Sequence, residues 1–130
     1  MDRQRAKVLL ADCHEDTLID LQRVLENAGF DTTAVWTSIE FVDAIRSQAF
    51  DLVLINEYMP GAPCQELLQL VRDADLRCVL LQARTPTITG PTTLGAGHAC
   101  CESVCKHDHS EIVRLVSDIL ANGENHIPVA

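Results

Sequence analysis

The sequence predicts an α/β domain built on a doubly wound, five-stranded parallel sheet. Short aliphatic runs alternate along the chain with segments whose apolar residues recur at three- and four-residue spacing. One run, at residues 51–55, is continuously apolar after its first residue, which is typical of a parallel strand covered on both faces. About five strand-and-helix units fill 130 residues, so a second domain is not expected.

The amino-terminal part of the chain begins this alternation. Residues 6–12 form an aliphatic run that ends in an acid, and the apolar spacing from Leu18 to Ala28 predicts a helix. Gly29 is expected to end that helix, because glycine readily adopts the left-handed conformation found at helix ends. A second strand is predicted over residues 30–36, and the capping-box pattern from Thr37 to Glu40 predicts the next helix start.

The middle of the chain continues the pattern. The strand at 51–55 stops at Asn56, and Pro60-Gly61 predicts a turn. The following helix has apolar residues along one face at 67–71, and a fourth strand is predicted over residues 77–81.

Residues 84–97 interrupt the alternation where a fourth helix is expected. This segment holds five Gly and Pro residues and five Thr residues, a composition that disfavours a regular helix. We therefore expect a short or irregular helix, or a long surface loop. A segment that rearranges when something binds is the alternative.

The carboxyl-terminal part contains the clearest helix signal. The pattern from Asp108 to Glu111 is another capping box, and the apolar residues within 112–120 form one stripe. The domain is expected to span residues 1–122. The polar residues 123–130 are interpreted as a tail or the start of a linker.

Charge and composition exclude several classes of partner. Ten Lys and Arg residues against nineteen Asp and Glu residues give a net charge of −9, which opposes direct binding to nucleic acid or to an anionic membrane. No apolar run approaches the roughly 20 residues that span a bilayer, and we expect a cytoplasmic protein. The six cysteines lack the regular spacing of a secreted scaffold, so reduced thiols are expected.

Nucleotide-binding motifs of other α/β folds are missing. The segment after the first strand, residues 11–17, contains no glycine, whereas phosphate-binding loops at this place are glycine-rich. We predict neither an enzyme nor a bound cofactor.

Polar side chains follow the predicted strands at their carboxyl ends. Asp12 follows the first strand, Asn56 the third, Gln82 the fourth and Lys106 the fifth. Reactive groups of open parallel sheets gather at this edge, so we expect these four side chains to share one cleft.

The order and type of these motifs resemble the receiver domain of bacterial two-component response regulators, over about residues 5–121. VLLAD at 8–12 is similar to the first strand and its acidic pair, and DLVLIN followed by EYMPG at 51–61 is similar to the third strand and the turn after it. Lys106 resembles the lysine that ends the fifth strand. The resemblance implies a domain of phosphorelay signal transduction.

The resemblance also implies chemistry that this sequence has altered. A receiver presents a carboxylate pair after its first strand and an acceptor aspartate after its third, which together hold Mg²⁺. Here Cys13 replaces one member of the pair, and Asn56 stands at the acceptor position with a poorly nucleophilic amide. Asp12, with carbonyl help from Tyr58, provides at most a weak magnesium site.

The switch positions of the family are changed as well. Gln82 stands for the hydroxyl residue and Ser103 for the aromatic residue, while Lys106 is expected to pair with Asp12. We therefore predict an atypical receiver, a pseudo-receiver, that acts by protein docking. Its partner would be a sensor kinase, an output domain or another signalling protein, and homodimerisation stays open. A conventional phosphorelay receiver with a displaced acceptor, for which Glu57 is the candidate, is a further alternative.

A second group of side chains suggests an alternative function on the same fold. Thiols and imidazoles at high density are potential ligands for zinc or another soft metal, and thiols also sense oxidants. This group consists of His98, Cys100, Cys101, Cys105, His107 and His109. It lacks a Cys-x-x-Cys pair, and Cys105 could simply fill the core. Cys13 has two interpretations: a thiolate activated by Lys106, or an inert residue that fills the space of a lost carboxylate.

Overall fold

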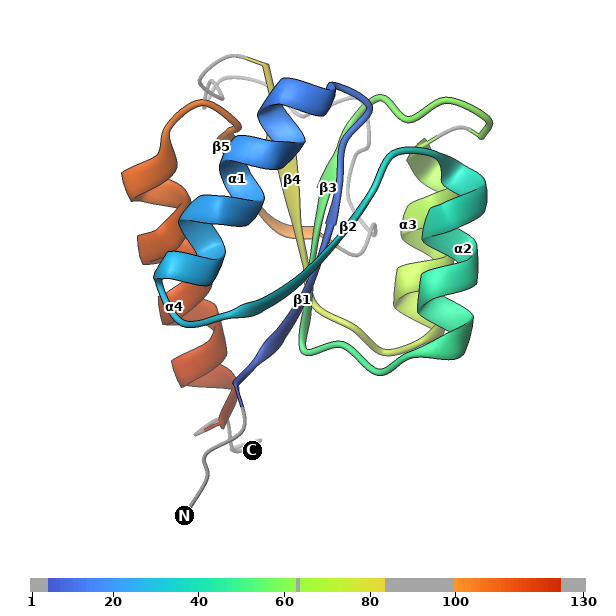
Figure 1. The fold of residues 1–130 in the computed structure, drawn as a ribbon. Coiled ribbons are helices and arrows are strands. Elements are labelled where there is room, and N and C mark those ends of the chain that lie inside the picture. Colours follow the sequence, from blue (N-terminus) through green and yellow to red (C-terminus); the bar gives the residue numbers. More distant parts are fainter. Residues whose placement is uncertain (1–4, 63, 84–99, 125–130) are drawn as a thin grey trace, which may run out of the picture.

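The structure is a computed structural model that describes residues 5–62, 64–83 and 100–124, with the side chains of 64, 100–102 and 122–124 left out. It confirms the predicted fold class: a parallel sheet of five strands in the order β2-β1-β3-β4-β5 (Figure 1). The strands are β1 (Lys7–Ala11), β2 (Asp31–Val35), β3 (Leu52–Asn56), β4 (Cys78–Gln82) and β5 (Cys100–Cys105). The helices are α1 (Glu15–Asn27), α2 (Ser38–Ser47), α3 (Cys64–Asp73) and α4 (His109–Glu124).

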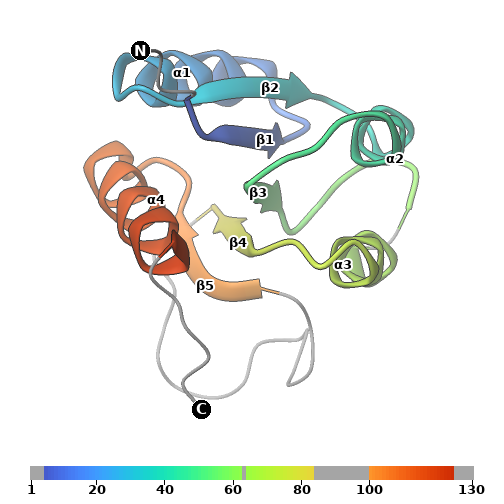
Figure 2. The ribbon, with the colours of Figure 1, turned by 90° about the horizontal axis from the view of Figure 1, so that it is seen from below.

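The helices cover both faces of the sheet. Figure 2 shows α1 and α4 on one side and α2 and α3 on the other. Side chains alternate between the faces of a strand, so Val8 and Leu10 of β1 join the core against α1 and α4. Leu9 and Ala11 join the core against α2 and α3. Each face therefore has its own hydrophobic core, as a doubly wound sheet requires.

The central strand β3 is buried along its whole length, as its continuous apolar run predicts. The observed strand includes Asn56, whereas the sequence pattern ends the strand at Ile55. Asp12 comes directly after the carboxyl end of β1, and its backbone N–H continues the strand pairing by donating to the Val35 carbonyl of β2 at 3.2 Å. Both polar residues are thus held by the sheet itself.

Both predicted capping boxes form only in part. The Thr37 side chain accepts a hydrogen bond from the Glu40 N–H at 3.2 Å, and the Asp108 carboxylate accepts one from Glu111 at the same distance. The reciprocal bonds differ from the pattern, because Glu40 accepts instead from the Trp36 N–H at 2.7 Å and Glu111 pairs with Arg114. The helix starts are therefore correctly predicted, while the acidic partners take other contacts.

The remaining predictions concern the helix ends and the irregular segment. Gly29 follows α1 with φ of 102°, as predicted for a helix end. The predicted irregular segment 84–97 lies outside the described residues. α4 continues to Glu124, past the predicted domain end at residue 122. Within the described ranges, no helix is both long and apolar enough to cross a membrane.

Candidate functional site

Three polar side chains are buried together at the carboxyl edge of the sheet. Asp12 follows β1, Asn56 ends β3 and Lys106 follows β5, and their exposed fractions are 0%, 3% and 4%. Buried polar groups require partners, because an unpaired charge in the interior is costly. The contacts among these residues therefore define the site.

The Asn56 amide is hydrogen-bonded at both ends. Its Nδ2 donates to Asp12 Oδ1 at 3.0 Å, and its Oδ1 accepts from the backbone N–H of Tyr58 at 3.0 Å. This orientation places the amide nitrogen on the carboxylate and the amide oxygen on a donor, as the chemistry of the two groups demands. A side chain held in this way bridges β1 and the loop after β3.

Lys106 supplies the positive charge that balances the buried carboxylate. Its Nζ lies 3.4 Å from Asp12 Oδ2 and 3.0 Å from His14 Nδ1, so the ion pair expected from the sequence is present. The Lys106 N–H donates to the Gln82 carbonyl at 2.8 Å, which fixes the chain after β5 against β4. Loss of one partner from a buried pair leaves the other charge uncompensated.

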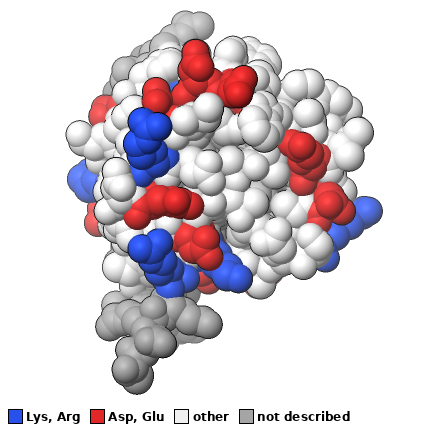
Figure 3. All heavy atoms as spheres, in the orientation of Figure 1, with Lys and Arg blue, Asp and Glu red and all other residues white. Residues whose placement is uncertain are grey.

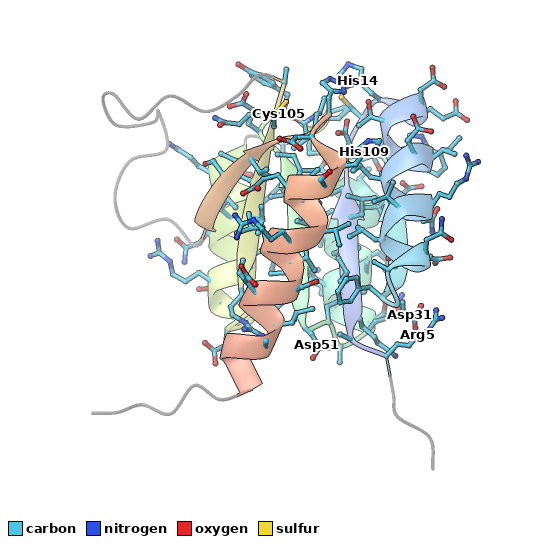
Figure 4. All side chains as sticks on the ribbon, turned by 90° about the vertical axis from the view of Figure 1, so that its left-hand side faces the viewer. Arg5, His14, Asp31, Asp51, Cys105 and His109 are labelled. Atoms are coloured by element: carbon cyan, nitrogen blue, oxygen red, sulfur yellow. The ribbon has the colours of Figure 1, made fainter. Side chains whose placement is uncertain are left out.

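His14 is a site residue that the sequence analysis did not single out. Its backbone N–H donates to Asp12 Oδ1 at 2.9 Å, and its Nδ1 lies 3.3 Å from the same oxygen. The ring projects at the carboxyl edge of the sheet, where Figure 4 labels it, and its side chain is 64% exposed. The sequence signal that could have identified His14 is its position two residues after Asp12.

The Cys13 thiol is partly buried, and its described contact is with the neighbouring imidazole. Cys13 Sγ lies 3.7 Å from His14 Nδ1. The sequence analysis considered Lys106 as the group beside this thiol, and the described contacts of the Lys106 ammonium are with Asp12 and His14.

The remaining predicted pocket residues lie around this centre. Tyr58 is 72% exposed, and only its backbone reaches the site. Gln82 Nε2 donates to Glu57 Oε1 over a long 3.5 Å, and its own Oε1 is buried without a hydrogen bond. Ser103 is partly buried on β5, opposite Leu80 of β4, and none of the described contacts joins it to Asp12 or Asn56.

The residues at this edge do not fit a magnesium ion. Mg²⁺ prefers an octahedral set of oxygen ligands, usually with one or two carboxylates. Asp12 is the one buried carboxylate among the described residues, and the Asn56 oxygen is already bonded to a backbone N–H. The neighbouring donors are a thiol and an imidazole, which magnesium does not favour.

The second predicted group is described only in part. His98 lies outside the described residues, and Cys100 and Cys101 lie on β5 with their side chains left out. Cys105 ends β5, His107 is exposed and His109 begins α4. Among the described side chains, the potential metal ligands that come together are Asp12, Cys13 and His14 instead.

Comparison with solved structures shows the same fold in known receiver domains. A CheY-like response regulator receiver domain protein from Methanospirillum hungatei superposes with a TM-score of 0.83 at 15% identity, covering 95% of this chain and 100% of the other. The receiver domain of the Francisella response regulator 1452 gives a TM-score of 0.79 at 21% identity, covering 92% and 99%. No family model matches the sequence.

Curated relatives point to the same class. The DNA-binding response regulator MtrA of Mycobacterium tuberculosis is 30% identical over 89 residues, which are 68% of this chain and 39% of MtrA. The sensory/regulatory protein RpfC of Xanthomonas campestris is 35% identical over 75 residues, 54% of this chain and 10% of RpfC. The matches thus span well under half the length of these relatives. Together with the fold, they identify this chain as a receiver domain of response-regulator signalling.

Proposed function

We propose that this receiver domain signals by docking to a protein partner, without forming an acyl phosphate at the usual position. The observation that carries this proposal is the Asn56 side chain, which stands where the family resemblance puts the acceptor and is bonded to Asp12 at 3.0 Å. An amide is neutral and a poor nucleophile, so attack on a phosphoryl donor at this position is not expected.

The contacts around Asn56 support a permanently assembled site. The Asp12 carboxylate accepts hydrogen bonds from the Asn56 amide and from the backbone N–H of His14, and its charge is balanced by Lys106. The buried charge of Asp12 is therefore balanced by Lys106 without a phosphoryl group. We assign no catalytic residue to it.

Exposed apolar side chains near the same edge support a docking role. Trp36 directly follows β2, Ile39 lies in the first turn of α2, and Tyr58 follows β3; their exposed fractions are 42%, 79% and 72%. Aromatic residues are enriched at protein interfaces. A groove of about 570 Å³ lies between α2 and α3, and Ile39 contributes to its lining.

The charge of the protein and its relatives favour a signalling protein as the partner. The net charge of −9 opposes direct binding to nucleic acid. Figure 3 shows acidic side chains gathered at the upper end of one face, where α1 begins, with both charge signs interspersed below. Relatives named as sensor and regulatory proteins make a sensor kinase, an output domain or another signalling protein the expected partner class.

The proposal is tested by exposing the reduced protein to Mg²⁺ and acetyl phosphate and measuring its mass by native mass spectrometry. A conventional receiver domain treated in parallel serves as the positive control. We expect the mass of this protein to stay that of the bare chain. A phosphoryl adduct would overturn the proposal, and its location on Glu57 would establish the displaced-acceptor alternative.

A further inference from the structure

We propose that Asp12, Cys13 and His14 form a binding site for a borderline or soft divalent metal ion, with Zn²⁺ as the test ion. These consecutive residues offer a carboxylate oxygen, a thiol sulfur and an imidazole nitrogen, all within 4.8 Å of one another. Such mixed donors are typical of zinc sites and unsuited to magnesium. The inference does not depend on the docking role.

Two of the three distances between the donor atoms match a tetrahedral zinc site. With usual zinc–ligand bond lengths, two ligands at a tetrahedral ion are about 3.3 Å apart for N and O, and about 3.6 Å apart for N and S. Here His14 Nδ1 lies 3.3 Å from Asp12 Oδ1 and 3.7 Å from Cys13 Sγ. For an ion to bind all three atoms, the Asp12 oxygen and the Cys13 sulfur, which lie within 4.8 Å of each other, must stand about 3.6 Å apart.

The Asp12 carboxylate is buried and held in place. Asp12 is fully buried, and its Oδ2 accepts no hydrogen bond, although a carboxylate oxygen offers two lone-pair sites. Its Oδ1 accepts from the backbone N–H of His14 and from the Asn56 amide, which hold the carboxylate in place. The carboxylate is therefore held in a fixed orientation, with Oδ2 beside the Lys106 ammonium and Oδ1 facing the imidazole.

The imidazole makes no helix-capping hydrogen bond that metal binding would break. His14 is the N-cap residue of α1, yet its side chain makes no capping hydrogen bond. Its 64% exposure leaves a path for an ion from solvent, and water can occupy the fourth position of the ion. The labelled ring in Figure 4 lies at the open edge of the sheet and not between helices.

Lys106 must give up one contact when the ion binds. Its Nζ now lies 3.0 Å from His14 Nδ1, the atom that would bind the metal. Its second contact, 3.4 Å from Asp12 Oδ2, involves the carboxylate oxygen opposite the one that faces the imidazole. One carboxylate can thus serve the ammonium with Oδ2 and the metal with Oδ1. The Cys13 thiolate supplies the second negative charge that a divalent ion beside a lysine requires.

The test measures binding of Zn²⁺, and of Co²⁺ as a spectroscopic probe, to reduced protein. Cys100, Cys101 and Cys105 are first replaced by Ser, which removes the rival thiols at 98–109. In this background, Cys13→Ser and His14→Gln are compared with His107→Gln, an exposed histidine near the same edge. Circular dichroism checks that each variant is folded. His14→Gln and His107→Gln in the wild-type chain repeat the comparison without changing a thiol.

We expect one Zn²⁺ per chain and a thiolate-to-cobalt absorption band in the background protein. Even outer partners of metal ligands contribute 10–100-fold to affinity, so removal of either ligand should raise Kd by about 100-fold or more. His107→Gln should change Kd by less than about 3-fold. Equal affinity after Cys13→Ser or His14→Gln would overturn the proposal, as would loss of binding when only the β5 cysteines are replaced. The acetyl phosphate experiment reports on the proposed function separately.

Discussion

Replacing Lys106 by Met tests the buried charge pair on which the site depends. The change removes the ammonium 3.4 Å from Asp12 Oδ2 and keeps a chain of similar length in a position only 4% exposed. Breaking a buried ion pair typically costs about 3–5 kcal/mol, because the remaining charge has no compensation. Asp12 keeps its hydrogen bonds from His14 and Asn56, which places the expected loss near the low end, about 3 kcal/mol.

Urea unfolding followed by circular dichroism measures this loss. For a domain of this size the urea m-value is about 1–3 kcal/mol/M, so the midpoint should fall by about 1–3 M. Arg114→Met is the matched control, because it removes a cation whose side chain is 57% exposed in a surface ion pair. Its midpoint should move by much less.

A double-mutant cycle separates the charge pair from general damage to packing. Asp12→Asn combined with Lys106→Met removes both charges, and replacement of a whole buried pair is often close to neutral. The double variant should therefore regain most of the stability that Lys106→Met loses. Equal shifts for Lys106→Met and Arg114→Met, or strict additivity in the cycle, would show that the buried charge pair does not stabilise the fold.

Two further changes probe a turn and a surface ion pair. At Gly61, φ is 103° and an added Cβ would lie 2.2 Å from Ser38 Oγ, so Gly61→Ala should destabilise by about 1–3 kcal/mol in urea unfolding. Gly29→Ala is the control, because Gly29 has φ of 102° and an added Cβ there meets no atom within 4 Å, so this variant pays only the cost of the backbone conformation. An equal loss of stability in the two variants would show that the Ser38 contact is unimportant. The hydrogen bond from Arg114 lowers the pKa of Glu111 below its ordinary 4.5, so this pair stabilises the fold above that pH and the benefit disappears on acidification. NMR titration of Arg114→Met should show the Glu111 pKa returning upward, and an unchanged value would contradict this.

The fold could be predicted because its signals are local and repeated. The aliphatic run at residues 52–55 and the helical spacing after Asp12 report which faces are buried, and burial determines these elements. Their order then implies a parallel sheet, since right-handed crossovers leave few arrangements. The carboxyl edge follows from that topology, which is why Asp12, Asn56 and Lys106 could be expected together.

The details of the site depend on contacts that no local pattern encodes. The position of His14 against Asp12 arises from the turn between β1 and α1, and its contact with Lys106 joins residues 92 positions apart. The Glu40 side chain likewise takes the Trp36 N–H, although the capping-box pattern assigns it to Thr37. The sequence therefore predicted the location of the site at the carboxyl edge of the sheet. It predicted neither the contact of the His14 imidazole with Asp12 nor the hydrogen bonds of the Asp12 carboxylate.

A comparison of the wild-type chain with the Cys13→Asp, Asn56→Asp double variant decides whether the natural site accepts a phosphoryl group. Both are treated with Mg²⁺ and acetyl phosphate, and their masses are measured by native mass spectrometry. The double variant restores three carboxylates at the carboxyl edge and should gain a magnesium-dependent phosphoryl adduct. We expect the mass of the wild-type chain to stay unchanged. A wild-type adduct of the same stoichiometry would contradict it.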